Sequence, residues 1–333
     1  MLRWIGVITC ALALLSCRQD FDITSAYIEI PVVYGLLDRA DTTHYVRIQR
    51  AFVDTNTSAL TIAPIFDSIY YRDVLDVTIT DDSTDKVFRL ERVVGDTIGL
   101  PKEPGLFNND ANVLYRFEAP LDIQRSYTLE VHHREKGWTI QSQTTVVGPV
   151  VSIVPNAQYV VNWKGELDEL IGLAWRRADN AMVYDLQAYF DYWEYPKDNR
   201  QDSTLYSIPF TILQASVANL IAPDFIITHS YAPRAFYQEL GAQIPFDTTV
   251  VRRAKQVRFV LSAGGEALGM WVANQQVQQG VTAGNNLEVY TNIEGGTGLF
   301  SSRSTVTFYN AIGGTLRDSL RLGQFTNTLG FLP

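Results

Sequence analysis

The most reactive side chains of the sequence are its two cysteine thiols, and one of them has a context that favours lipid attachment. Cys17 ends the run Leu14-Leu15-Ser16-Cys17, which closes an apolar stretch at 4–15. A thiol can carry a diacylglycerol, the small Ser16 leaves room for a signal peptidase, and the leucines suit an apolar recognition site. The pattern therefore predicts a bacterial lipobox, with residues 1–16 as signal peptide and Cys17 as the lipidated first residue of the mature chain.

The apolar stretch is too short for a transmembrane anchor. A helix of about twelve residues is about 18 Å long, whereas the hydrocarbon core of a bilayer is about 30 Å thick. The alternative is an ordinary cleaved signal in which Cys17 is a coincidence. With the lipobox, Cys10 leaves with the signal and Cys17 carries the lipid, so the mature chain has no thiol for a disulfide, a metal site or catalysis. This lipid is the one attached group that we expect, and no cofactor is predicted.

The four histidines do not have the spacing of a metal site. His132 and His133 are adjacent, so on a strand they point to opposite faces. His44 and His229 are isolated, and a zinc site needs three or four convergent ligands. The run Asp81-Asp82-Ser83-Thr84-Asp85 gathers oxygen ligands that calcium would accept, but it lacks the glycine and distal glutamate of a known calcium loop. We therefore predict a solvated hairpin turn there and no metal site.

The glycines of Gly295-Gly296-Thr297-Gly298 could cradle a phosphate, but their surroundings favour a structural turn. A phosphate loop lies between a strand and the N-terminus of a helix, and here a strand is expected to follow. Glycine also permits the positive φ angles of tight turns. We predict a turn formed and braced by Asn292, Glu294, Gly295, Gly296 and Gly298.

Catalytic motifs are scarce. The sequence has no Gly-x-Ser-x-Gly nucleophile elbow. Paired carboxylates of a glycoside hydrolase meet in space and not in sequence, so they stay an open alternative. An aromatic-rich segment suggests binding instead, because exposed rings can stack on sugars or fill a pocket of a partner. The predicted binding residues are Tyr189, Tyr192, Trp193 and Tyr195; alternatively, half of these rings lie in the core and the rest cover a sheet edge.

Strands are the elements that would position these groups. After a tether at 17–26, short segments of alternating polar and apolar residues follow one another to residue 148. The clearest segments are 27–37, 44–52, 74–80 and 127–132. About seven strands separated by turns predict an immunoglobulin-like β-sandwich over 27–148.

The region 149–333 is also predicted to be rich in strands. Ile171, Leu173 and Trp175 alternate before a turn, and 182–193 then places Tyr184 inward, an arrangement that resembles the core of a fibronectin type III sandwich. Further strands are expected at 206–213, 257–261, 287–291 and 305–309. Helices are expected at 233–240 and 266–278. The predicted fold is mainly β, with two β-sandwich domains of which the second carries one or two short helices.

The net charge of the chain indicates which classes of partner we do not expect. The net charge is −9 with a pI near 5.0, and loss of Arg3 with the signal makes the mature chain one unit more acidic. An acidic surface argues against nucleic acid as a partner and against electrostatic binding to anionic lipid.

Three segments resemble an uncharacterised family of Bacteroidota outer-membrane lipoproteins of unknown function. They are Tyr34-Gly35-Leu36-Leu37, Tyr45-Val46-Arg47-Ile48 and, most specific, Asn292-Ile293-Glu294-Gly295-Gly296-Thr297-Gly298-Leu299-Phe300. Members resemble this chain in having a lipobox, an N-terminal β-sandwich and a second β-rich domain that ends in such a block. Their genes often lie beside TonB-dependent receptors, which implies an accessory role at the outer membrane. No catalytic residue comes with the resemblance.

Together these patterns predict a lipid-anchored protein of the outer membrane, on its periplasmic or its cell-surface side, that acts by binding and not as an enzyme. The expected partners are the membrane, through the lipid, and a β-barrel transporter or other surface complex. A glycan- or nutrient-binding surface lipoprotein is the first alternative, and a glycoside hydrolase is the second.

Overall fold

The computed structural model describes residues 28–53, 69–102, 111–164, 169–217, 225–279 and 289–333. These residues form fifteen strands, three α-helices and one short 3-10 helix, η2 (Gly95–Ile98). The predicted mainly-β class with few helices is therefore confirmed. Cys17, the signal peptide and all of the predicted tether lie outside the described residues.

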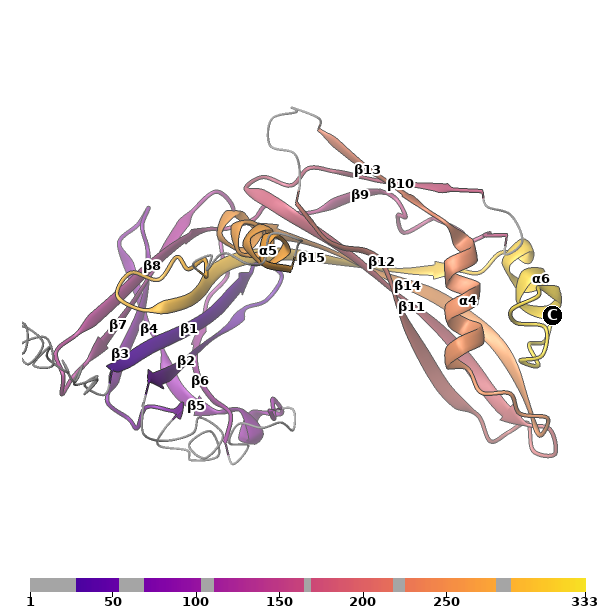
Figure 1. Ribbon diagram of the computed structural model, residues 1–333, viewed down its shortest axis with the longest axis horizontal. Helices are drawn as coiled ribbons and strands as arrows, with labels where there is room; N and C mark the ends of the chain where they lie inside the picture. Colours follow the sequence, from indigo (N-terminus) through magenta and orange to yellow (C-terminus); the bar gives the residue numbers. More distant parts are fainter. Residues whose placement is uncertain (1–27, 54–68, 103–110, 165–168, 218–224, 280–288) are drawn as a thin grey trace, which may run out of the picture.

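Eight strands form one continuous sheet, here called sheet A, that runs through both halves of the chain (Figure 1). Its strands are β1 (Ile28–Asp38), β2 (Thr43–Val53), β5 (Glu91–Val94), β6 (Val113–Glu118), β11 (Ala181–Pro196), β12 (Thr204–Val217), β14 (Val250–Gly265) and β15 (Thr297–Ala311). Their order is β12-β11-β14-β15-β1-β2-β6-β5. Strand β1 pairs in parallel with β15 and antiparallel with β2, so the first strand lies between its sequence neighbour and the last strand.

In the first half of the molecule, sheet A faces a second sheet, sheet B. Its strands are β3 (Leu75–Asp81), β4 (Lys86–Arg89), β7 (Ser126–His133) and β8 (Thr139–Thr145), in the order β4-β3-β7-β8. The alternation seen in the sequence places Val77 and Ile79 of β3 in the core between the sheets, with Phe300 of β15 in the same core. This half is therefore a β-sandwich to which the C-terminal region contributes a strand.

In the second half, one face of sheet A is covered by sheet C and two helices. Sheet C contains β9 (Val151–Val154), β10 (Ile171–Arg176) and β13 (Ile226–Tyr231), and the helices are α4 (Pro233–Gln243) and α6 (Gly314–Leu322). Trp175 and Tyr184 are fully buried in this core, as the sequence predicts. The Tyr184 hydroxyl accepts a hydrogen bond of 2.9 Å from the backbone N–H of Ala178, which fixes the turn between β10 and β11.

The third helix, α5 (Glu266–Gln279), lies at the joint of the two halves (Figure 1). Helices α4 and α5 confirm the helices predicted at 233–240 and 266–278. Helix α6 was not predicted, although Leu316 and Leu320 have the i, i+4 spacing of a buried helical stripe. The strand predicted at 287–291 is wrong where the structure describes it, because residues 289–291 are irregular.

Hydrogen bonds tie the two halves together at the joint. The Ser302 hydroxyl donates to the carbonyl of Thr145 at 2.6 Å and accepts from the N–H of Val147 at 3.0 Å. Asn180 donates to the carbonyl of Val146 at 3.1 Å. The division of the chain near residue 148 stays a prediction, but a shared sheet and these bonds make the halves parts of one framework.

Candidate binding site

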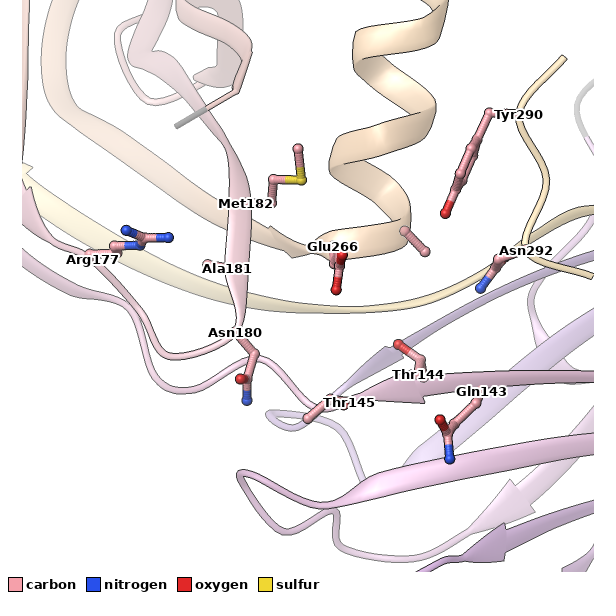
Figure 2. Close-up of a pocket in the computed structure, with 11 residues that line it drawn as sticks. Gln143, Thr144, Thr145, Arg177, Asn180, Ala181, Met182, Glu266, Tyr290 and Asn292 are labelled. Carbon is pink, nitrogen blue, oxygen red and sulfur yellow. The ribbon is translucent and has the colours of Figure 1, made fainter. Parts of the chain in front are cut away.

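A pocket lies at this joint, between β8, the β10–β11 turn and the start of α5 (Figure 2). Its volume is about 480 Å³, within the range of small-molecule sites. Four separate segments line it, with the residues Gln143, Thr144, Thr145, Arg177, Asn180, Ala181, Met182, Glu266, Ala267, Tyr290 and Asn292. We call this the joint pocket.

Glu266 and Tyr290 lie close together in the lining of the joint pocket. Figure 2 shows both side chains pointing into the same space, with Thr144 on the strand below them. Burial raises the pKa of Tyr290, and the negative charge of Glu266 raises it further. The phenol therefore stays protonated at neutral pH and can donate a hydrogen bond.

Hydrogen bonds to the backbone hold other polar side chains of the pocket in place. The Asn292 amide donates to the carbonyl of Phe300 at 2.7 Å and accepts from the Phe300 N–H at 3.0 Å. The backbone N–H of Tyr290 donates to the side chain of Asn274 on α5. Asn180 has a φ of 60°, which asparagine tolerates in a tight turn. The pocket wall is thus built before a ligand arrives.

Several polar groups of the pocket are uncommitted. Within the described ranges, no hydrogen bond is formed by the side chains of Thr144, Arg177, Glu266 and Tyr290. A carboxylate offers only acceptors, a guanidinium offers only donors, and the two hydroxyls offer both. This set can bind a small polar molecule that carries several hydroxyl or amino groups.

A glycoside hydrolase would need two carboxylates in one pocket. Glu266 is the one carboxylate in the lining of the joint pocket. A second pocket, of about 230 Å³, holds Glu135, and a third, of about 320 Å³, holds Asp41. None of these three pockets therefore provides the paired carboxylates of that alternative.

The four predicted binding aromatics do not share one surface. Tyr192 is only 2% exposed and belongs to the core of the second half, because side chains alternate along β11 and Tyr192 follows Phe190 inward. Tyr189, Trp193 and Tyr195 point to the opposite face and are partly exposed. The prediction that all four line one binding surface is corrected for Tyr192.

The glycine block forms the start of β15. Gly295 and Gly298 have φ angles of 79° and 115°. Glu294 pairs through its backbone with Gln141 of β8, while its side chain is exposed. Asn292 holds the backbone of Phe300, so the block joins β15 to both sheets of the first half. A helix does not follow the glycines, and the arrangement differs from a phosphate loop.

Two of the histidines and Asp81 form hydrogen bonds with other groups of the protein. His44 donates to the carbonyl of Ala119, and the Nδ1 atom of His133 accepts from the N–H groups of Glu135 and Lys136. Asp81 accepts hydrogen bonds from Arg125 and from the backbone of Ser83. In the part of the chain that the structure describes, no three His, Cys, Asp or Glu side chains lie close enough to hold a metal ion.

The joint pocket was missed at the sequence level because its walls come from distant segments. Of its lining, only Asn292 was singled out, and for a turn. Glu266 gave one usable signal, because it is the first residue of the helix predicted at 266–278.

The chain matches no protein-family model and no curated protein. Among the helices described, none is both long and apolar enough to cross a bilayer.

Proposed function

We propose that this chain is a lipid-anchored binding protein of the outer membrane that works beside a β-barrel transporter of the TonB-dependent type or another surface complex. The observation that carries the proposal is the joint pocket. It presents uncommitted hydrogen-bonding groups from four segments together with a single carboxylate, a set suited to holding a polar solute and not to the paired-carboxylate chemistry of glycosidases.

The anchor follows from the lipobox at Cys17. Lipid chains contribute about 0.8 kcal/mol for each buried methylene, so two or more chains hold a protein at a membrane stably. The accessory role follows from the resemblance to lipoproteins encoded beside TonB-dependent receptors. An anchored protein with a solute pocket fits a place next to a transporter.

Affinity purification tests the partner. The lipidated full chain is purified from detergent-solubilised outer membranes, and co-purifying proteins are identified by mass spectrometry. The expected result is a β-barrel protein in a stoichiometric amount that is absent when Cys17→Ser is purified in the same way. A lipidated protein that purifies alone contradicts the accessory role.

Ligand binding tests the pocket separately. Sugars, amino acids and other polar solutes are screened by thermal shift, and hits are measured by calorimetry. We expect Glu266→Gln to weaken binding about tenfold or more, because a hydrogen bond to a charged group contributes about 1.5–3 kcal/mol. Glu294→Gln is the matched control, since Glu294 is an exposed glutamate outside the pocket. Equal affinities of these two variants would contradict the assignment of the pocket.

A glycan- or nutrient-binding surface lipoprotein that acts alone is the second candidate. It is favoured by the partly exposed Tyr189 and Trp193 on the open face of sheet A. A protein that purifies without a β-barrel partner but binds glycans would support this candidate over the accessory role.

A further inference from the structure

One face of sheet A, on its second half, carries aromatic and basic side chains in neighbouring rows. Residues paired across adjacent strands point to the same face of a sheet. Tyr189 of β11 pairs with Arg258 of β14, and Arg258 pairs with Tyr309 of β15. Trp193 pairs with Arg253, and Lys255 lies at the adjacent irregularity of β14. We define the aromatic–basic face by Tyr189, Trp193, Arg253, Lys255, Arg258 and Tyr309.

Two cation–aromatic pairs organise this face. The Arg258 guanidinium lies 4.2 Å from the centre of the Tyr189 ring, and the Lys255 ammonium lies 5.5 Å from the centre of the Trp193 ring. Tyr189 and Trp193 are four residues apart on one strand, so the two pairs are separated by about 13 Å. A ligand that contacts both pairs must be extended.

The charge of the aromatic–basic face is opposite to that of the whole chain. The face carries three basic residues, Arg253, Lys255 and Arg258. The carboxylate that lies among them is Asp191, which is 6% exposed and accepts hydrogen bonds from Ser207 and Gln256. The whole chain has a net charge of −9. A local positive field on an acidic protein favours an anionic ligand at this face.

Described elements leave this face open. Sheet C, α4 and α6 pack against the opposite face of sheet A, and α5 covers the open face only near the joint, where Leu268 meets Gly264 (Figure 1). Arg253, Lys255 and Tyr309 are exposed, with Tyr309 at 64%. The polar and aromatic side chains here are therefore accessible to a large ligand.

We infer that the aromatic–basic face binds an acidic polysaccharide, a linear chain of sugar rings that carry carboxylates. Aromatic rings stack on the apolar faces of sugar rings, and a cation held beside each aromatic ring can pair with a carboxylate on the same sugar. The face lies over inner strands whose backbone groups are already paired, so it offers no free strand edge to an acidic peptide. Sugar recognition by side chains accounts for these observations best.

This site is separate from the joint pocket and does not depend on a membrane partner. Loss of polysaccharide binding would therefore leave the co-purification result of the proposed function unchanged, and the two can fail independently.

Three probes of matched chemistry test the inference on the full mature chain by calorimetry. Polygalacturonate carries both sugar rings and charge, its fully methyl-esterified form carries rings without charge, and polyglutamate carries charge without rings. We expect binding of polygalacturonate that weakens as salt is raised, because exposed charges are screened beyond about 10 Å at 0.1 M salt. We expect binding of the other two probes to be weaker by about tenfold or more, a loss of about 1.4 kcal/mol.

Variants locate the site. Trp193→Ala and Lys255→Gln should each weaken polygalacturonate binding about tenfold. Lys86→Gln is the matched control, because Lys86 lies 4.7 Å from the ring centre of Phe88 in a similar pair on sheet B. Lys255 is exposed, so Lys255→Gln tests the site even if Trp193→Ala folds poorly. Unchanged affinity of Lys255→Gln, or equal binding of polyglutamate, would overturn the inference; the latter result would indicate an acidic protein partner.

Discussion

Gly298 of β15 and Val33 of β1 are partners in the parallel ladder that joins the two ends of the chain, and Gly298 has a φ of 115°. A Cβ atom at Gly298 would overlap the carbonyl oxygen of Val33. Only glycine therefore permits the last strand to approach the first strand this closely.

We expect Gly298→Ala to lower the free energy of unfolding by about 3 kcal/mol, from backbone strain and overpacking together. Urea denaturation measures the change. Gly172→Ala is the control, because Gly172 lies on a strand with open space around its Cα and without a positive φ. Equal denaturation midpoints of the two variants would contradict the predicted overlap between a Cβ atom at Gly298 and the carbonyl oxygen of Val33.

Removal of the Arg252 side chain should destabilise the C-terminal region. Arg252 is 1% exposed, forms an ion pair of 2.8 Å with Glu194 and donates to the carbonyls of Leu329 and Pro245. We expect Arg252→Met to cost about 3–5 kcal/mol, since one partner of a buried pair is lost. The exposed neighbour serves as control, with Arg253→Met expected within about 0.5 kcal/mol of the wild type. Guanidinium denaturation compares them, and a wild-type midpoint for Arg252→Met would refute the prediction.

Stability should decrease on mild acidification. Burial, aided by the charge of Lys136, lowers the pKa of His133 below its ordinary 6.5, and burial lowers the pKa of His44 in the same direction. The unfolded chain then binds protons more tightly than the folded chain. The stability that these two neutral histidines contribute is fully present above about pH 6.5, and it is lost as the pH falls toward their pKa values in the folded chain.

Urea midpoints at pH 7.5 and pH 5.5 measure this effect. His133→Gln should reduce the difference between the two midpoints, and His132→Gln should retain it, because His132 is the neighbouring histidine on the outer side of the strand. A higher midpoint at the acidic pH would show that the sign is wrong.

A fragment of residues 27–148 is expected not to fold alone. It lacks β15, which pairs with β1, and it lacks Phe300, which is fully buried in the core of the first half. The expected result is a poorly dispersed NMR spectrum and no cooperative unfolding transition, against a cooperative transition for residues 27–333. A well-dispersed spectrum of the fragment would support independent domains divided near residue 148.

The local parts of this fold could be predicted from the sequence. Alternation placed Val77, Ile79 and Tyr184 inward, and helical periodicity found α5, because both signals repeat within a few residues. The pairing of strands could not be predicted, because the ladder between β1 and β15 joins segments far apart in the sequence and leaves no local pattern. Tyr192 was misplaced because an aromatic cluster in the sequence does not state which face of the strand each ring takes.

The joint pocket depends on the same distant pairings. Thr144, Asn180, Glu266 and Tyr290 become neighbours only after β15 has aligned the two halves. The residue types alone could suggest that the protein binds a polar ligand, but they could not show which side chains line the pocket together.

The ladder between β1 and β15 also sets an order of events while the chain is synthesised. Synthesis starts at the N-terminus and makes β1 early, yet the partner of Tyr34 is Leu299 in β15. The entropy of closing so long a loop opposes early pairing, and contacts of this range slow folding. Strand β1 therefore has one unpaired edge until β15 has been made, and an unpaired strand edge is a template for aggregation.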